Sequence, residues 1–268
     1  MSMNDLDIQE FERRFAVEFD GIEDFHSGIA VVNIDGKFGG INKKGKIVIP
    51  LIYDYISDFS DNMAVAYIDD KGGFIDTKGK QIGSMIYDGI CGEFINGFVK
   101  VCINEKFGFV NKMGELVVQC IYDSAEDFTK FGMAKVCIDG KYGFVNSIGE
   151  PIIQCIYDSV KDFAYGMAIV SINGKYGIVN KMGELVIPAI YDNAEYFTDG
   201  EFIVKQGKTW GIINKEGDIV IDLKYDKIYG KSNGYIIVEI NGVVQRIDST
   251  GKILSYRELQ TIYNRKSK

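Results

Sequence analysis

The sequence predicts an all-β protein built as a tandem array of seven short antiparallel units. Three observations predict it: an aromatic-Asp dipeptide that returns at a fixed period, an Asn- or Asp-headed turn in every unit, and runs of β-branched residues between the turns. The dipeptides begin at Phe19, Tyr53, Tyr87, Tyr122, Tyr157, Tyr191 and Tyr225. Their spacing of 34 or 35 residues indicates a repeat architecture, in which each unit buries its apolar face mainly against its neighbours.

The domain organisation follows this period. We expect an N-terminal cap at residues 1–18, one repeat domain at 19–258 and a C-terminal tail at 259–268. The units start near residues 19, 53, 87, 122, 157, 191 and 225. Apolar residues recur near helical spacing close to both ends, at Leu6, Phe11 and Phe15 and at Leu259, Ile262 and Tyr263. Short helical caps are therefore predicted at the ends of the array.

Each unit is predicted to hold three strands. In the fifth unit, runs at 167–172, 175–179 and 184–187 are strand-like, and Ala168, Val170 and Ile172 share the side that we expect in the core. The turn between the first two runs is Asp35-Gly36, Asp139-Gly140, Asn173-Gly174 or Asn241-Gly242 in four units, a strong signal for a two-residue hairpin.

The turn between the second and third strands is present in all seven units. It begins with Asn42, Asp76, Asn111, Asn146, Asn180, Asn214 and Asp248 and ends three residues later with Gly45, Gly79, Gly114, Gly149, Gly183, Gly217 and Gly251. An Asn or Asp side chain caps its own turn, and the glycine supplies a left-handed conformation. The predicted unit is thus a three-stranded antiparallel meander.

The connector that follows the aromatic-Asp pair also repeats in sequence, because a phenylalanine recurs at matching positions, at Phe25, Phe59, Phe94, Phe128, Phe163 and Phe197. The aspartate itself is present in all seven copies, and we interpret it as an Asx-turn or as the cap of a short helical turn. A row of calcium ligands is the alternative, but one carboxylate per repeat lacks the dense oxygen set that Ca²⁺ requires.

In the second strand an aromatic residue is followed by glycine, at Phe38-Gly39, Phe107-Gly108, Tyr142-Gly143, Tyr176-Gly177 and Trp210-Gly211. With the Asn-Lys-x-Gly turns and the Tyr-Asp pairs, this motif resembles the bacterial WG-repeat family, also called KWG repeats, over nearly the whole array. The resemblance implies an all-β repeat fold and leaves function open, because the family is largely without an assigned activity. The second copy, Gly72-Gly73, and the seventh, Val244-Gln245, depart from the pattern, and we expect looser packing there.

The glycine of this motif either admits a neighbouring backbone or marks a bulge. Its aromatic partner shares a strand face with apolar residues such as Ile178, so we interpret the ring as part of the core; a row of rings offered to sugars or peptides is the alternative.

A row of lysines recurs at one position of the repeat, at Lys37, Lys71, Lys106, Lys141 and Lys175, and we interpret it as a solvated strand edge.

Composition and motifs argue against several function classes. The net charge of −8 argues against nucleic acid and anionic membranes as partners. The acidic N-terminal segment does not resemble a secretory signal, no apolar run approaches the ~20 residues of a membrane span, and five cysteines form an odd set. We read the cysteines as small buried hydrophobes and expect a cytoplasmic location.

We predict that the protein is not an enzyme, with no catalytic residue, no cofactor and no metal. His26 is the only histidine and lies in a connector. Gly207-Lys208-Thr209 looks like the end of a P-loop, but Phe202 stands where that motif needs glycine.

The first functional hypothesis is a scaffold or binding module for a protein partner, using the variable positions Tyr55, Gly89, Ser124, Ser159, Asn193 and Lys227. The alternative is a carbohydrate-binding module that uses connector aromatics such as Tyr165 and Tyr196. No individual contact residue is assigned. For the array we prefer an open β-solenoid over a seven-bladed ring, because three strands are one short of a propeller blade and the two ends differ.

Overall fold

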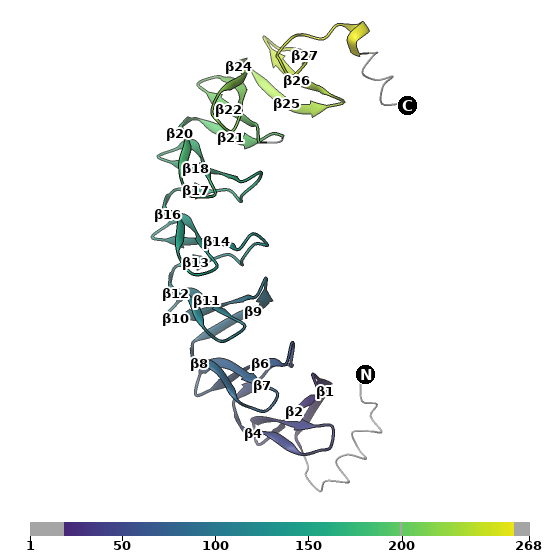
Figure 1. Cartoon of the computed structure of the whole chain (residues 1–268), viewed down its shortest axis with the longest axis vertical. Coiled ribbons are helices and arrows are strands. Elements are labelled where there is room, and N and C mark those ends of the chain that lie inside the picture. Colours follow the sequence, from purple (N-terminus) through teal and green to yellow (C-terminus); the bar gives the residue numbers. More distant parts are fainter. Residues whose placement is uncertain (1–18, 199, 260–268) are drawn as a thin grey trace. The chain divides into compact units, whose positions relative to one another are not determined.

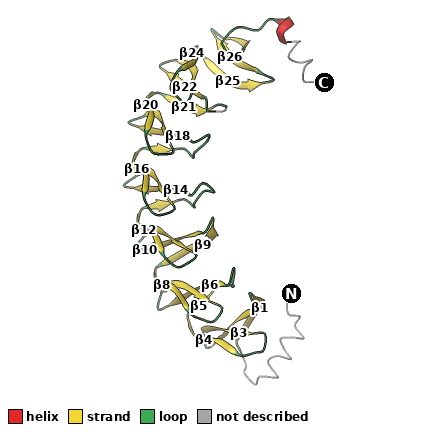
Figure 2. Cartoon of the chain, viewed as in Figure 1, coloured by secondary structure: helices red, strands yellow, loops and turns green. Residues whose placement is uncertain are grey.

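A computed structural model of the chain describes residues 19–198 and 200–259. Within these residues almost every regular element is a strand (Figure 2), and the strands form seven antiparallel sheets. Each sheet consists of strands that are consecutive in the sequence, and the labels of Figure 1 follow that order. The seven sheets confirm the predicted all-β array of seven units.

The seven sheets are numbered here in chain order. The first holds β1 (Gly21–His26), β2 (Ile29–Ile34), β3 (Lys37–Asn42) and β4 (Ile47–Tyr53); the second β5 (Tyr55–Ile56), β6 (Met63–Ile68), β7 (Lys71–Asp76) and β8 (Gln81–Tyr87); the third β9 (Gly89–Ile95), β10 (Phe98–Ile103), β11 (Lys106–Asn111) and β12 (Leu116–Tyr122). The fourth holds β13 (Ser124–Ala125), β14 (Met133–Ile138), β15 (Lys141–Asn146) and β16 (Pro151–Tyr157); the fifth β17 (Ser159–Val160), β18 (Met167–Ile172), β19 (Lys175–Asn180) and β20 (Leu185–Tyr191). The sixth holds β21 (Asn193–Tyr196), β22 (Phe202–Gln206), β23 (Thr209–Ile213) and β24 (Ile219–Tyr225), and the seventh β25 (Lys227–Ser232), β26 (Tyr235–Ile240) and β27 (Val243–Ile247).

The predicted number of strands per unit was wrong. Six sheets have four strands, because the connector after each aromatic-Asp pair supplies an additional strand ahead of the predicted three. In three of these sheets that strand is two residues long, as in β5, which is too short for any alternation to be read from sequence. The seventh sheet has three described strands, and its fourth position is reduced to a single bridge between Ile247 and Ile253. The comparison with a four-stranded blade therefore no longer favours the open form.

Both predicted turns are confirmed. In the first, Asn173 and Gly174 have φ of 51° and 74°, so both central residues are left-handed, as the mirror-image hairpin turn requires. In the second, Asn180 Oδ1 accepts hydrogen bonds from the backbone N–H of Met182 at 2.9 Å and of Glu184 at 3.0 Å. The same pair of bonds recurs in all seven units, at Asn42, Asp76, Asn111, Asn146, Asn180, Asn214 and Asp248.

The described residues fall into two compact units, one comprising 19–138 with 145–150, the other 139–144 with 151–198 and 200–259. In each unit the apolar cores join consecutive sheets. In the first unit, Ile49 and Tyr53 of β4 pack with Ile56, Ala66 and Ile75 of the second sheet. In the second unit, one core spans the fifth and sixth sheets and another the sixth and seventh. Neighbouring sheets are thus held together by buried apolar side chains, as predicted for repeats that cannot bury a face alone.

Two recurring glycines allow this close packing. A Cβ on Gly143, the glycine of the aromatic-Gly motif, would lie 2.2 Å from the carbonyl oxygen of Ile153 in the same sheet. The pairing register also shifts beside the equivalent glycines of other sheets, between Tyr176 and Ile178 for example. The motif glycine therefore both admits a neighbouring backbone and accompanies a bulge, the two alternatives that the sequence left open.

The second glycine closes the Asn- or Asp-headed turn and faces the preceding sheet. A Cβ on Gly183 would lie 1.9 Å from the carbonyl oxygen of Ile152, and one on Gly149 would lie 2.1 Å from that of Val117. Each of these turns thus lies directly on the fourth strand of the sheet before it. This contact covers part of an edge strand that would otherwise be exposed to pairing with another chain.

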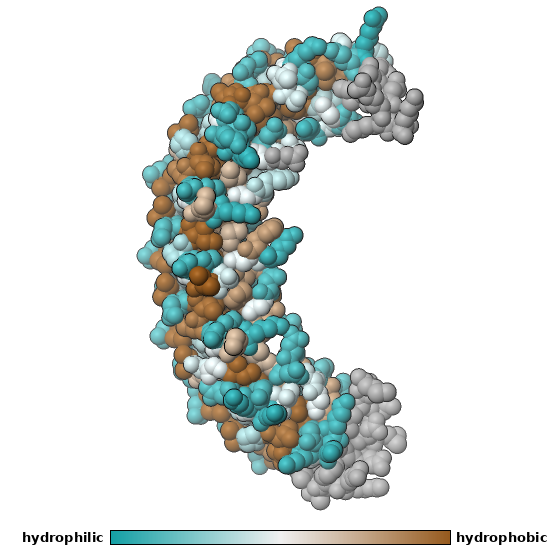
Figure 3. Space-filling view, in the orientation of Figure 1, coloured by the Kyte–Doolittle hydropathy of each residue, from teal (hydrophilic) through white to brown (hydrophobic). Residues whose placement is uncertain are grey.

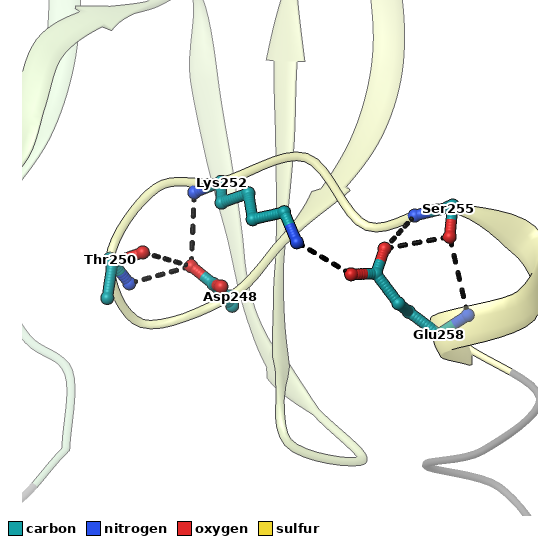
Figure 4. Close-up of polar contacts among 5 residues, drawn as sticks. All are labelled: Asp248, Thr250, Lys252, Ser255 and Glu258. Carbon is teal, nitrogen blue, oxygen red and sulfur yellow. Dashed lines mark hydrogen bonds and ion pairs between the residues drawn. The ribbon is translucent and has the colours of Figure 1, made fainter.

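The predicted N-terminal cap lies outside the described residues. At the other end a helical turn occupies 256–259, and residues 260–268 lie outside the described part. Ser255 caps this turn: its backbone N–H donates to Glu258 Oε2 at 2.8 Å, and Glu258 N–H returns to Ser255 Oγ at 3.4 Å (Figure 4). This is a capping box, and Lys252 Nζ, 2.7 Å from Glu258 Oε1, ties it to the last described turn, which Asp248 heads.

Candidate functional site

The aspartate of each aromatic-Asp pair links two consecutive sheets. Asp192 precedes β21, and its Oδ2 accepts a hydrogen bond from the backbone N–H of Gly207, in the hairpin turn of the same sheet, at 2.6 Å. Its Oδ1 lies 2.5 Å from Nζ of Lys175, at the start of β19 in the preceding sheet. We call this arrangement the aspartate clasp. The predicted local Asx-turn or helical cap is corrected, because the amide that the carboxylate binds lies 15 residues away.

The clasp recurs along the array. The ion pair is made by Lys37–Asp54, Lys71–Asp88, Lys106–Asp123, Lys141–Asp158 and Lys175–Asp192. The lysine row is about half exposed, but its members serve as partners of this aspartate row. A hydrogen bond from Lys175 and a second from the Gly207 amide hold the pKa of Asp192 below its ordinary value, and the lysine partners do the same for Asp54, Asp88 and Asp158.

These carboxylates are structural anions. A carboxylate that is ionised and bound to a lysine is a poor general acid. Among residues 19–198 and 200–259, no group of three or more His, Cys, Asp or Glu residues is placed to hold a metal ion. The aspartate row therefore stabilises the contact between sheets.

His26 lies beside a carboxylate, and most of the cysteines are half-buried. His26 Nε2 lies 3.9 Å from Asp58 Oδ2, and both side chains are exposed. Cys137 is buried and the other four cysteines are half-buried, and none forms a disulfide in the described chain. Burial raises the pKa of the Cys120 thiol to about 11, which keeps it protonated and unreactive at neutral pH.

The connector tyrosines of the carbohydrate hypothesis differ from one another. Tyr165 is exposed, whereas the Tyr196 hydroxyl donates to the Asp162 carbonyl at 2.6 Å and accepts from the Ile169 N–H at 3.2 Å. Burial raises the pKa of Tyr196 to about 12. Tyr196 therefore joins the fifth and sixth sheets, and of the two only Tyr165 presents a ring to solvent.

The rings of the aromatic-Gly motif are half-buried. Phe38, Phe107, Tyr176 and Trp210 each stand opposite the tyrosine that ends the fourth strand of their sheet, as Tyr176 does to Tyr191 and Trp210 to Tyr225. Tyr176 and Trp210 pack against the apolar cores of the second unit. This placement supports the core interpretation over a ligand platform.

The variable positions after each aspartate are mostly at the surface. Tyr55, Ser124, Ser159 and Lys227 are exposed, and Gly89 and Asn193 are half-buried. Tyr55 is the one large apolar ring among the six, and its side chain lines a pocket that is described below.

A row of exposed isoleucines recurs along the array and was not predicted from the sequence. The residue before the tyrosine of the Tyr-Asp pair is Ile52, Ile86 and Ile121 in the first structural unit and Ile156 and Ile190 in the second, and each side chain is 46–52% exposed. We call these residues the isoleucine row; the sixth sheet has Lys224 at this position. Their recurrence at one strand position was the signal that could have revealed them. Brown apolar side chains are visible at the surface among teal ones in Figure 3.

A pocket of about 360 Å³ lies in the first structural unit, between the second and third sheets. Met63, Val65, Phe74, Phe94 and Val99 give it an apolar lining. Its polar lining consists of Ser57, Asp58, Ser60, Asp61, Glu93 and Lys112. Lys112 Nζ lies 2.5 Å from Asp61 Oδ2, and this contact holds the pKa of Asp61 below its ordinary value.

Gly92 marks where this pocket forms. Gly92 is an additional residue of the third connector: Phe94 lies seven residues after Tyr87, whereas Phe128 lies six after Tyr122. Cys91 pairs with Lys100 at the place that Glu126 takes in the next sheet, and Gly92 follows it with a φ of 80°. A Cβ built at Gly92 would meet no atom within 4 Å. The third connector therefore has one more residue than its counterparts, without a side chain, where it borders the pocket.

No helix in the described part of the chain is long and apolar enough to cross a membrane.

Comparison with curated proteins returned no match to this sequence. Among solved structures, the chain is similar to a eukaryotic initiation factor at 11% identity, with 89% of this chain and 77% of the other covered and a TM-score of 0.39. It is also similar to Hsv2p of Kluyveromyces lactis at 14% identity, with 82% and 89% covered and a TM-score of 0.30. Such distant likenesses assign neither a closed ring nor a function.

The sequence pattern of the WG containing repeat matches the chain seven times in succession. The matched stretches are 15–38, 38–71, 73–107, 107–142, 142–176, 176–210 and 210–243. They leave out Gly72 and end before Val244, where the second and seventh copies depart from the aromatic-Gly pair. The chain therefore belongs to the WG-repeat family.

Proposed function

We propose that this protein is a non-catalytic binding scaffold, and that its isoleucine row contacts apolar side chains of a protein partner. Single exposed apolar residues are ordinary in soluble proteins, so one such isoleucine would carry no weight. The observation that supports the proposal is the recurrence: five consecutive sheets place the same large apolar residue at the same half-exposed position of the fourth strand. Recurrent apolar surface is typical of sites that are covered by a partner.

The row also has a plain structural explanation, since isoleucine favours β-strands. The two explanations differ in what a charge would do. On a merely solvated strand, lysine is tolerated, as it is at Lys224 in the sixth sheet. In an interface core, an introduced lysine would have to be desolvated, and binding would weaken.

The test uses three forms of the full chain: wild type, the variant Ile86→Lys with Ile121→Lys, and a control, Ser84→Lys with Gln119→Lys. The control adds the same charges at exposed positions two residues earlier on β8 and β12. Proteins retained from the source lysate by wild type and control, but lost from the isoleucine variant, are purified and titrated directly. We expect binding of such a partner to weaken at least about tenfold in the isoleucine variant, roughly 1.4 kcal/mol.

Equal affinity of the purified partner for all three forms would refute the role of the row. The carbohydrate alternative is tested alongside on a glycan array, because the exposed Tyr165 retains a ring that a sugar could stack on. Specific glycan binding that is lost in Tyr165→Ala, with no partner retained from the lysate, would replace the scaffold by a lectin-like module.

We also propose that the array is open. Support comes from the sheets themselves: each is made of consecutive strands, so in the described chain no strand from one end completes the sheet at the other. The last sheet gives way to the Ser255-capped helical turn. Small-angle X-ray scattering distinguishes the forms, because an open array gives a skewed pair-distance distribution and a closed ring a nearly symmetric one.

A further inference from the structure

The pocket between the second and third sheets has an unusual combination of linings. Its apolar floor includes Phe74 and Phe94, whose ring centroids are 5.4 Å apart, together with Val65 and Val99. A volume of about 360 Å³ is at the small end of the range for ligand sites in proteins. The size fits a compact group on an apolar stem.

The polar lining has an excess of negative charge. Three carboxylates, Asp58, Asp61 and Glu93, line the pocket, and Lys112 is its one cationic lining residue. Lys112 is held on Asp61, so one carboxylate is neutralised within the pocket. Asp58 Oδ2 lies 3.9 Å from Nε2 of His26, the last residue of β1, and Glu93 follows Gly92 in β9.

We propose that this pocket binds an organic cation, an ammonium or guanidinium group carried on an apolar stem. Asp58 and Glu93 bind the charged group, the phenylalanine and valine side chains enclose the stem, and the half-exposed Tyr55 ring offers its face to the cation. Such a group occurs both as a free amine and as the arginine or lysine side chain of a partner protein. This inference goes beyond the proposed scaffold function and does not depend on the isoleucine row.

Charge complementarity favours a cation over a neutral sugar. A sugar would need several convergent neutral donors and acceptors, whereas Ser57 and Ser60 are the neutral hydroxyls of the lining besides Tyr55. Ser57 Oγ already accepts the backbone N–H of Val65 at 3.0 Å and donates to the Asp58 carbonyl at 3.1 Å. An anionic ligand would be repelled by the remaining carboxylates.

The test is a titration of the full chain, monitored by NMR of the methyl groups of Met63, Val65 and Val99. The probes are N-acetyl-arginine methylamide, its neutral isostere N-acetyl-citrulline methylamide, and phenethylammonium as a free amine. The variant Asp58→Asn with Glu93→Gln removes the two charges without changing shape. The control is Asp127→Asn, at the position of Glu93 in the next connector of the same structural unit, where Asp127 is similarly exposed.

We expect saturable shifts of these methyl groups with the arginine probe or with phenethylammonium, at a Kd of about 1 mM or below. Binding should weaken at least about tenfold in the double variant and for the citrulline probe, while Asp127→Asn leaves it unchanged. Tighter binding of the arginine probe would indicate a partner's side chain, and tighter binding of phenethylammonium a free amine. No saturable shift with either cation, or equal binding of citrulline and arginine probes, would overturn the proposal.

Discussion

At the scale of single residues, one carboxylate per repeat performs a role that its local sequence does not reveal. Asp88 accepts the backbone N–H of Asn104 at 2.6 Å and pairs with Lys71 of the preceding sheet. Local signals suggested an Asx-turn, because Asp before a turn is typical of one. The constant separation of 17 residues between Lys71 and Asp88, and between the equivalent pairs, was present in the sequence, but a charge pair at that separation could be assigned only once the strand register was known.

The clasp predicts a specific pH dependence. The pKa of Asp88 is lowered in the folded protein, first by the hydrogen bond from Lys71. Its stabilising effect is therefore complete above the ordinary aspartate pKa of about 3.9 and is lost as the pH falls through the lower folded value. We expect the variant Lys71→Met to melt at a lower temperature than wild type near neutral pH, with the difference shrinking below about pH 4.

Thermal melts followed by circular dichroism between neutral and strongly acidic pH measure this difference directly. The effect is expected to be small, because the pair is exposed. A melting difference that stays constant across the whole range would show that Lys71 acts through its aliphatic stem and not through the ion pair.

The motif glycine gives a second prediction at this scale. In Gly143→Ala, the new Cβ would meet the Ile153 carbonyl oxygen at 2.2 Å, and backbone cannot yield as a side chain does. We expect a loss of about 1 to 3 kcal/mol in the free energy of unfolding, or more, as for other overpacked sites. Chemical denaturation followed by circular dichroism measures it.

Gly21→Ala is the matched control for this substitution. Its added Cβ would meet the side-chain oxygen of Asn33, which can move away, and Gly21 does not require a left-handed backbone. A loss at Gly143 no greater than that at Gly21 would contradict the close-packing role of the motif glycine.

At the scale of elements, the structure differs most from the sequence prediction in the connectors. The turns and the three central strands follow from hairpin dipeptides, Asx-turn chemistry and the run of β-branched residues. The expected single core face of β18 was wrong, because Ile169 and Ser171 on the other face are buried as well as Ala168 and Val170, and Ile172 is half-buried. The short first strands could not be predicted in this way, because a strand of two residues, such as Ser124 and Ala125, cannot show an alternating pattern of apolar and polar residues. Their pairing depends on the tertiary position of the chain after the clasp, which local propensity does not encode.

The second sheet shows how an element compensates for a lost motif residue. Gly72 stands where other copies have the aromatic ring, yet the space is filled: a Cβ there would lie 2.7 Å from the ring of Tyr67, its cross-strand neighbour. The Tyr67 hydroxyl also accepts the backbone N–H of Ile90, in the third sheet, at 3.0 Å. The expected looser packing of this copy is therefore offset by an aromatic residue on the adjacent strand.

We predict that Tyr67→Phe weakens the contact between the second and third sheets. The Ile90 N–H would lose its acceptor while the ring still fills the space at Gly72, which costs about 1 kcal/mol for one hydrogen bond. Hydrogen exchange of the Ile90 amide should become several-fold faster. The neighbouring Asp88 amide, bonded to the Cys102 carbonyl, should keep its rate, and equal acceleration of both amides would indicate general unfolding of the sheet instead.

At the scale of the whole molecule, the repeat sets both the period of the sequence and the contacts that stabilise neighbouring sheets. Within each structural unit, three kinds of contact join a sheet to the next one: the shared apolar core, the aspartate clasp and the turn glycine on the fourth strand. The lysine and aspartate of the clasp are 17 residues apart in every pair, and the turn glycines lie about one repeat length after the strand that they contact. The array should therefore tolerate loss of a whole period and not of part of one.

Two deletions differ in whether they remove a whole repeat. Deleting 123–157 joins Tyr122 to Asp158, which restores a Tyr-Asp pair. Lys106, which now pairs with Asp123, would meet Asp158 in its place, and the turn that Gly183 closes would lie on β12 near Val117. Deleting 123–140 instead joins Tyr122 to Lys141, so that the chain continues without a clasp aspartate and without the strand β14.

The most direct test of the account is to compare these two deletions by circular dichroism, analytical ultracentrifugation and thermal melting. We predict that the chain lacking 123–157 is a soluble β protein with a cooperative melt and the same oligomeric state as the full chain. The chain lacking 123–140 should aggregate or lose its cooperative transition. Equal behaviour of the two deletions, whether both fold or both fail, would contradict the claim that sheets are joined through contacts in a fixed repeat register.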